Sequence, residues 1–150
     1  MIRTDTEYGR QQTTLKEQEA FMAAQEKALR EEGIAGEHLR RAMAPIRTFH
    51  EGLREEVEAY RLLRDEQDLE AVRLFDTLGK QLIALRIMRG VTQRELAKRL
   101  GVHESQVSRD EKHEYHRISD ERAMALLLAL RVKMERTYSL VIDEPALKEA

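Results

Sequence analysis

The sequence predicts a mainly α-helical protein, and three observations lead to this prediction. Apolar residues recur every three or four positions along much of residues 14–63, which is the period of amphipathic helices. Residues 92–112 contain two short helical patterns separated by a glycine, and only residues 132–142 alternate with period two. The expected parts are a helical hairpin or coiled-coil arm (1–67), a five-helix domain (71–130) and a C-terminal tail with a β-strand (131–150).

The composition limits the classes of protein to which the chain can belong. At 150 residues the chain is long enough for one domain with an appendage. Charged residues make up 36% of it and aromatic residues 5%, which fits helices with much solvated surface better than one large core. Without cysteine, we expect neither a disulfide framework nor a thiolate metal site. An apolar run of signal-peptide or membrane length is also lacking, which predicts a cytoplasmic protein.

The arm is expected to contain two helices. The first begins at Thr14, because Thr14 and Glu17 have the spacing of a capping box, and it ends at Gly33. After a short helical turn at residues 37–43, the second helix has Pro45 in its first turn, a position that suits proline. The apolar stripes are Leu15, Phe21, Met22, Ala28 and Leu29 on the first helix and Ile46, Phe49, Leu53, Val57, Tyr60 and Leu63 on the second.

These two stripes and their short connection predict an antiparallel helical hairpin. Each stripe is too thin to form a core alone, which leaves two interpretations open. Either the hairpin is a solvated arm folded on itself, or its seam is a surface for a second subunit or a partner protein.

The best-defined pair of helices is expected within residues 92–112. Thr92 begins the first of them, because its hydroxyl and the Glu95 carboxylate can form a reciprocal capping box. Gly101 can take the left-handed conformation that ends a helix. The second helix begins at His103 or Glu104 and has Val107 as its inward anchor. Around this pair we expect a polar hinge at 65–70, a helix over 71–89, a loop at 113–118 and a helix from Ser119 that buries Ala123, Leu126, Leu127 and Leu130.

This spacing resembles the helix-turn-helix of the Xre/Cro/lambdoid-repressor family. The resemblance covers roughly residues 76–130 and implies a lambda-repressor-like domain that binds DNA. It also implies a buried ion pair between Arg86 and Glu111. The residues that carry it are Leu82, Leu85, Arg86, Gln93, Ala97, Gly101, Val107 and Glu111.

The resemblance further implies which side chains contact DNA. The groove-facing residues of the second helix are Glu104, Ser105 and Arg109, with Gln106 and Ser108 beside them, and the expected phosphate contacts are Gln93, Lys112 and Arg117. Arg109 can bond a guanine bidentately, whereas Glu104 can accept from a cytosine amino group or interact with the helix N-terminus. For Lys98 and Arg99, a solvated helix face is the simpler interpretation.

Asp110 departs from the family's pattern, which usually has a large apolar or aromatic residue at this position. Its spacing from Val107 directs it partly towards the core, where an unpaired carboxylate is costly. We therefore expect Asp110 either to lie outward at the end of the helix or to pair with an arginine such as Arg86 or Arg117.

The tail changes its period after Leu130. Val132, Met134, Tyr138, Leu140 and Ile142 alternate with mostly polar residues, which predicts a β-strand. A lone strand has open edges, so it would pair with its copy in a second subunit or with a partner protein. The alternative is a helix that continues past Leu130, and Pro145 ends either form.

The charges are unevenly distributed along the chain. Residues 76–119 hold nine Lys or Arg and six Asp or Glu, a balance of +3, although the whole chain has a net charge of −2. The positive excess therefore lies on the segment with the helix-turn-helix pattern, where phosphate binding needs it.

Two functions of different classes follow. The first is a transcriptional repressor that binds a palindromic operator as a homodimer, because a dimer matches the two-fold symmetry of such DNA. The second is an antitoxin that neutralises a toxin and represses its own operon. It rests on the similarity to HigA-like antitoxins of the opening residues (Met1, Ile2, Arg3, Glu7, Tyr8) and of the run 106–116.

An enzyme is the third and weakest hypothesis. We expect no catalytic activity and no cofactor, because the sequence has no plausible catalytic constellation and no glycine-rich phosphate loop. His103, His113 and His116 do not predict a metal site, because no carboxylate or thiolate pattern completes a ligand set.

Overall fold

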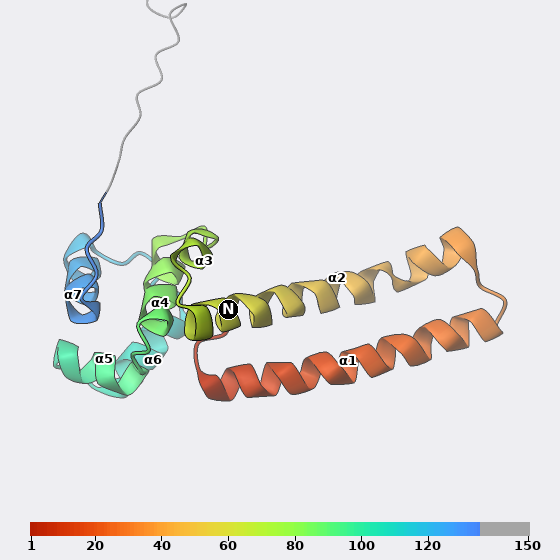
Figure 1. Cartoon of the computed structure of the whole chain (residues 1–150), viewed down its shortest axis with the longest axis horizontal. Coiled ribbons are helices and arrows are strands. Elements are labelled where there is room, and N and C mark those ends of the chain that lie inside the picture. Colours follow the sequence, from red (N-terminus) through yellow and green to blue (C-terminus); the bar gives the residue numbers. More distant parts are fainter. Residues whose placement is uncertain (136–150) are drawn as a thin grey trace, which may run out of the picture.

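The computed structural model, which describes residues 1–135, consists of a long helical hairpin that projects from a small helical domain (Figure 1). The described residues form helices and no strands, which confirms the mainly α-helical prediction. The elements are α1 (Asp5–Glu31), α2 (Gly36–Arg61), a π-helical turn η1 (Leu62–Glu66), α3 (Leu69–Arg73), α4 (Leu78–Met88), α5 (Gln93–Leu100), α6 (Glu104–Lys112) and α7 (Asp120–Leu130). None of these helices is long and apolar enough to cross a membrane.

Helix α1 begins much earlier than Thr14, so the predicted start was wrong. Thr4 is its N-cap, and the Thr4 hydroxyl accepts a 3.2 Å hydrogen bond from the backbone N–H of Glu7. Thr14 lies inside the helix, where its hydroxyl donates to the carbonyl of Arg10. A threonine with a glutamate three positions later therefore does not mark a helix start by itself, because its hydroxyl can bond the preceding turn instead. The predicted end is confirmed, since α1 stops just before Gly33, which has φ 83°.

Helix α2 begins at Gly36 and contains Pro45 in its interior, so neither a helix start at Pro45 nor a separate turn at 37–43 occurs. An interior proline removes one hydrogen bond and crowds the preceding turn. Leu39 and Met43, both upstream of the proline, are buried, and Met43 is fully so. Burial of these side chains offsets the cost of the proline and keeps the helix continuous.

In the middle of the hairpin, between Met43 and Tyr60 of α2, fewer apolar side chains are buried than the apolar spacing predicts. Phe49, which was expected in the seam, is 69% exposed, and Phe21 on α1 is 56% exposed. Near the domain, by contrast, Tyr60 and Leu63 are buried in the same apolar cluster as the residues of α4. The expected antiparallel arrangement of α1 and α2 is present (Figure 1).

The base of the hairpin is part of the domain's core. Ile2 and Tyr8 are buried in that core, and the Tyr8 and Tyr60 rings stack with their centroids 5.0 Å apart. The guanidinium of Arg64 lies 4.6 Å from the centroid of the Tyr8 ring, which places a cation over its face. The arm is therefore attached through packed side chains as well as through the chain itself.

The segment 71–89, predicted as one helix, is divided into α3 and α4. The chain turns at Gln67 and Asp68, within the expected hinge, and α3 ends at Arg73. Thr77 then begins α4, because its hydroxyl accepts from the backbone N–H of Lys80. A new N-cap so close to the end of α3 allows the two helices to take different directions.

Helix α4 lies at the centre of the domain, and helix α7 closes the core. Leu82, Ile83 and Ala84 of α4 are buried together with Val107 of α6. The residues of α7 that were expected to be buried all are: Ala123, Leu126, Leu127 and Leu130.

Helix α7 ends at Leu130, because Arg131 takes a left-handed conformation with φ 55°. A helix that continues past Leu130 is therefore wrong. Residues 132–135 are neither helix nor strand, so the structure gives no support for a strand that begins at Val132. The rest of the expected strand, residues 136–142, lies outside the described residues.

Candidate nucleic-acid interface

The candidate interface is built on α5 and α6, and α5 begins with a reciprocal capping box. The backbone N–H of Glu95 donates to the Thr92 hydroxyl at 3.1 Å, and the backbone N–H of Thr92 donates to the Glu95 carboxylate at 2.9 Å. The backbone N–H and the hydroxyl of Thr92 both donate to the Glu95 carboxylate, and these two hydrogen bonds hold the pKa of Glu95 below its ordinary value. The predicted capping box is confirmed.

The turn between α5 and α6 is also set by local contacts. Gly101 has φ 67°, and the backbone N–H of the next residue, Val102, donates to the carbonyl of Ala97 at 3.0 Å. This is the glycine-ended helix that the sequence predicts. His103 then caps α6, because its Nδ1 accepts from the backbone N–H of Ser105 at 3.2 Å. The start of α6 at Glu104 thus lies where it was expected.

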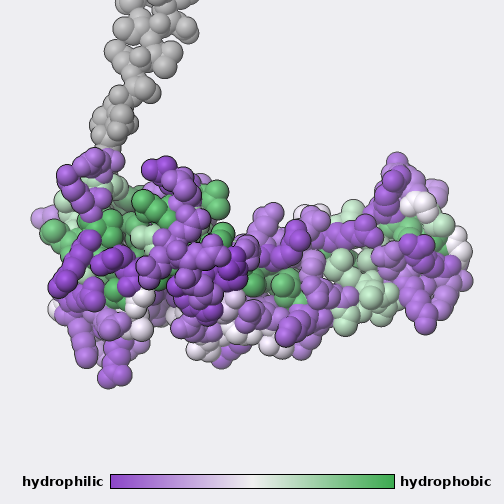
Figure 2. Space-filling model, in the orientation of Figure 1, coloured by the Kyte–Doolittle hydropathy of each residue, from purple (hydrophilic) through white to green (hydrophobic). Residues whose placement is uncertain are grey.

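Helix α6 has one buried side and one exposed side. Val107 and Glu111 are completely buried, so this pair points into the domain. Ser105, Arg109 and Lys112 follow each other at intervals of four and three residues on the exposed side. The other candidate residues of α6, namely Glu104, Gln106 and Ser108, are exposed as well. Hydrophilic residues predominate at the lower edge of the domain, near α5 (Figure 2).

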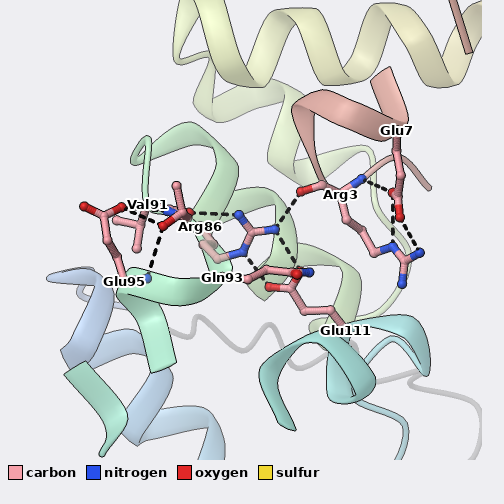
Figure 3. Close-up of polar contacts among 8 residues, drawn as sticks. Arg3, Glu7, Arg86, Val91, Gln93, Glu95 and Glu111 are labelled. Atoms are coloured by element: carbon pink, nitrogen blue, oxygen red, sulfur yellow. Dashed lines mark hydrogen bonds and ion pairs between the residues drawn. The ribbon is translucent and has the colours of Figure 1, made fainter. Parts of the chain in front are cut away.

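A buried polar network holds α6 against α4 and α5 (Figure 3). Arg86 on α4 donates through Nε to Glu111 Oε1 at 2.5 Å and through Nη2 to Glu111 Oε2 at 2.8 Å. This is the ion pair that the resemblance implies. Gln93 at the start of α5 donates its side-chain amide to the same Glu111 carboxylate at 2.7 Å. Glu111 thereby joins three helices and fixes the orientation of α6.

Arg86 also binds two backbone carbonyls, and one of them belongs to the arm. Its Nη1 donates to the carbonyl of Val91 and its Nη2 to the carbonyl of Arg3, both at 2.8 Å (Figure 3). Arg3 and Arg86 are 83 positions apart in the sequence. Sequence reasoning missed this contact because a backbone carbonyl leaves no residue signature. The Arg3 side chain is itself held by Glu7, with Nη2 of Arg3 at 2.7 Å from Oε1 of Glu7.

Asp110 is paired with an arginine, as expected, although the partner is neither Arg86 nor Arg117. Its Oδ2 lies 3.3 Å from Nη2 of Arg122 on α7, and the Asp110 and Arg122 side chains are 35% and 29% exposed. Arg86 already forms an ion pair with Glu111, so Arg86 is not available to Asp110. The neighbouring aromatic residue Tyr115 is buried instead of Asp110 and belongs to the apolar core cluster.

The two basic residues near the end of α5 differ in their contacts. Arg99 is exposed, as expected, and it also donates through Nη1 to the carbonyl of Ala129 on α7 at 2.9 Å. The reason is that α5 packs along α7, which brings the last carbonyls of α7 within reach of a long side chain. Lys98 is exposed, as expected.

The remaining candidate residues fall into two groups on either side of α6. Gln93 and Glu104 border one cavity of about 220 Å³, together with Arg94 and with Arg3 and Arg64 of the arm base. On the other side, Gln106 and Arg117 border a hollow that also contains Asp110 and Arg122. The structure thus brings Glu104 of α6 close to Gln93 at the start of α5, and it places Arg117 beside Gln106 of α6. Sequence reasoning did not single out Arg94 as a residue of this cavity, because no motif in the sequence marks it.

Comparison with known proteins agrees with this geometry. Residues 82–136 match the model of an Xre-like helix-turn-helix family, a span that runs from α4 past the end of α7. Neither the curated proteins nor the solved structures that were compared contain a match. The chain therefore contains a helix-turn-helix domain, which supports its assignment as a DNA-binding transcription regulator.

Proposed function

We propose that the protein is a sequence-specific repressor that binds a palindromic operator as a homodimer, with α6 in the major groove. The observation that carries this proposal is the division of α6 into two sides. One side is locked to the domain by Val107 and the buried Glu111 carboxylate, while the opposite side presents short and basic polar groups to solvent. A rigid helix with an exposed polar face is what direct recognition of base edges requires.

Ser105 and Arg109 are the proposed base-contacting residues. Nε of Arg109 donates to the carbonyl of Ser105 at 3.2 Å, so the guanidinium stays along the exposed face of α6. Its other nitrogens remain available for the two acceptors of a guanine. Ser108 lies next to this face, and Glu104 at the start of α6 is suited to a cytosine amino group. Gln106 lies at the edge of the same helix.

Phosphate contacts are proposed on both sides of this helix. The side-chain amide of Gln93 is engaged by Glu111, whereas the backbone N–H of Gln93 has no acceptor within the described residues. That N–H lies at the start of α5, where the helix dipole favours an anion. Lys112 at the end of α6 and Arg117 in the following loop supply cations at the other side.

The test compares wild-type protein with Arg109→Ala on duplexes selected from a random DNA pool by the wild type. We expect Arg109→Ala to weaken binding to the selected duplexes by about 1–3 kcal/mol and to leave binding to random duplexes nearly unchanged. Arg54→Ala on α2, an exposed arginine outside α5 and α6, is the matched control. Circular dichroism establishes that each variant folds. Equal affinity of Arg109→Ala and wild type for the selected duplexes would refute the assignment of Arg109.

An antitoxin that binds a partner toxin is the second candidate function. The observation that favours it is an exposed apolar surface next to acidic residues, away from α6. Leu74 is 75% exposed and, with Phe75 and Leu62, borders a hollow that also contains Glu55 and Glu56 of α2. Such a surface suits a basic partner with apolar anchors.

This candidate function is tested with the product of a neighbouring gene, if that gene encodes a small basic protein. The two proteins are co-expressed and purified through a tag on the partner. Leu74→Glu is expected to abolish co-purification while leaving the binding of selected DNA intact. If the two proteins still co-purify after this change, the surface at Leu74 is not the surface that binds the toxin.

A further inference from the structure

One guanidinium nitrogen joins the base of the arm to helix α6. Nη2 of Arg86 donates both to the backbone carbonyl of Arg3 and to Oε2 of Glu111, each at 2.8 Å (Figure 3). The two N–H bonds of this nitrogen point in fixed directions, because a guanidinium is planar. The position of the Arg3 carbonyl is therefore linked geometrically to the position of the Glu111 carboxylate.

The arm holds the Arg3 carbonyl in place from two directions. Ile2, the preceding residue, is 4% exposed and belongs to the domain's apolar core. On the other side, Oε2 of Glu7 accepts from the backbone N–H of Arg3 at 2.9 Å, and Oε1 of Glu7 lies 2.7 Å from Nη2 of the Arg3 side chain. Glu7 stands in the first turn of α1, so this hold depends on the arm helix. The carbonyl is thus a fixed acceptor for Arg86.

The same contact shields the buried ion pair from water. Arg3 and Arg86 both border the cavity of about 220 Å³ at the junction of arm and domain, yet the Arg86 side chain is only 5% exposed. If the Arg3 carbonyl moved away, the freed N–H of Arg86 would bond water in this cavity. Water beside the guanidinium weakens its attraction to a carboxylate, because it raises the local dielectric constant. A loose arm base would therefore loosen the link between Arg86 and Glu111.

Helix α6 depends on that link for its orientation. It has only nine residues, and the two that are buried are Val107 and Glu111. With Glu111 released, Val107 remains as a pivot about which the short helix can rock. A binding constellation must be held within about 0.5 Å of its productive geometry, so Ser105 and Arg109 would lose their alignment with base edges.

We propose that the base of the arm is a positioning element for α6. Glu7 holds Arg3, whose carbonyl holds Arg86. Arg86 in turn holds Glu111 and, through it, α6. No hydrogen bond or ion pair joins Glu7 to α5 or α6 within residues 1–135, so the effect of Glu7 on α6 passes through Arg3. The inference rests on the proposed function for the role of α6 in recognition, and it adds that the arm sets how selectively α6 reads DNA.

The first test follows amide hydrogen exchange in the full chain without DNA. Glu7→Ala is expected to speed exchange in α6 by about twofold to thirtyfold and to leave exchange in α7 unchanged. A change that merely destabilised the domain would speed exchange in both helices equally, because both would exchange through global unfolding. Equal acceleration in α6 and α7, or wild-type exchange in both, overturns the proposal.

Glu26→Ala is the matched control for the loss of a carboxylate from α1. Glu26 also pairs with an arginine four residues away, and its side chain is 31% exposed against 33% for Glu7. Glu26 belongs to the last turns of α1, which lead to the connection of the hairpin, far from the domain (Figure 1). Glu26→Ala should therefore leave exchange in α6 unchanged, and loosening of α6 equal to that in Glu7→Ala would refute the positioning role.

Glu7→Gln tests whether the backbone of Arg3 is the link. Its side-chain amide keeps an oxygen that can accept from the backbone N–H of Arg3, although it loses the charge that pairs with the Arg3 guanidinium. Glu7→Gln should therefore retain most of the protection of α6. If Glu7→Gln loosens α6 as much as Glu7→Ala does, positioning through the Arg3 backbone is refuted.

The second test measures the affinities for selected and for random duplexes. Glu7→Ala is expected to lower the ratio of these two affinities by about twofold to thirtyfold, while random duplexes bind as before because the phosphate contacts are untouched. Glu26→Ala removes the same charge and should keep the wild-type ratio.

The two tests separate this inference from the proposed function. If wild type selects no DNA sequence, the proposed function fails, and hydrogen exchange alone still decides whether the arm positions α6. If wild type selects DNA and Glu7→Ala keeps the wild-type ratio, the positioning role is refuted and DNA recognition stands.

Discussion

Nε of Arg86 on α4 lies 2.5 Å from Oε1 of Glu111 on α6, and the two side chains are only 5% and 0% exposed. Glu111 also accepts from Gln93, so one carboxylate compensates the buried guanidinium and orients two further helices. We expect Glu111→Gln to lower the free energy of unfolding by about 3–5 kcal/mol, because it leaves a buried charge uncompensated. Urea unfolding followed by circular dichroism measures this loss.

The control for this prediction removes both charges. The double variant with Arg86→Met and Glu111→Leu is expected to be more stable than Glu111→Gln, because it leaves no unpaired charge inside the domain. A loss of less than about 1 kcal/mol in Glu111→Gln would mean that water reaches the ion pair and that the pair does not hold α6.

Gly79 in the first turn of α4 has no room for a side chain. A Cβ atom there would lie 1.9 Å from the carbonyl oxygen of Glu114, in the loop that follows α6. Gly79→Ala must therefore displace that loop, and we expect it to lower the free energy of unfolding by about 1–3 kcal/mol. Gly52→Ala in α2 is the matched control, because its Cβ would meet nothing within 4 Å. There the same change should stabilise the chain by about 0.5–1 kcal/mol.

The loop that contacts Gly79 leads from α6 to α7, so Gly79→Ala should also weaken DNA binding through Arg117. If Gly79→Ala and Gly52→Ala change the unfolding free energy equally, the close packing of α4 on this loop is absent in solution.

Lys112 at the end of α6 is expected to contact one DNA phosphate. Lys112→Ala should weaken binding to selected and random duplexes alike, because a phosphate contact carries no sequence information. It should also reduce the magnitude of the slope of log K against log salt concentration by about 0.9, because about 0.9 counterions are released per neutralised phosphate. Lys16→Ala, at an exposed position of α1, provides the control. An unchanged slope in Lys112→Ala would exclude this contact.

Tyr115 makes the domain sensitive to alkaline pH. Burial, and secondarily the negative charge of Glu111, raise the pKa of Tyr115 above its ordinary value near 10. Its stabilising contribution is therefore complete below about pH 10 and is lost as the pH rises from there towards the higher pKa of the folded state. The Tyr115 hydroxyl has no partner within the described residues, so Tyr115→Phe removes no hydrogen bond.

We expect Tyr115→Phe to match or exceed wild-type stability at pH 7 and to lose less stability between pH 9 and pH 11 in urea titrations. Some alkaline loss should remain, because burial and Asp5 also raise the pKa of Tyr60. Identical pH profiles for Tyr115→Phe and wild type would show that Tyr115 does not titrate in this way.

The helix-turn-helix could be predicted closely because its signals are local. Thr92 and Glu95 form their capping box within four residues, and Gly101 ends α5 by its own backbone conformation. Ser119 likewise begins α7 at the expected position. Such contacts depend little on what the rest of the chain does, so the pattern of residue types is sufficient to place them.

The arm could be predicted only in outline for the opposite reason. Thr14 has the same local pattern as a helix start, yet α1 already begins after Thr4. Pro45 would begin a helix in isolation, but the buried Leu39 and Met43 extend α2 upstream of it. In both places the burial of apolar side chains outweighs the local preference for a helix start.

The sequence by itself determined that the chain is mainly helical, that its DNA-recognition pattern lies at residues 92–112, and which side chains of α6 face outward. Only the tertiary structure decided the long-range partners. It pairs Asp110 with Arg122, joins the carbonyl of Arg3 to Arg86, and leaves Leu128 exposed. The physical reason is that caps and periodicity act over one or two turns of backbone. The partner of a buried charge or an apolar side chain depends instead on which remote elements the packed core brings beside it.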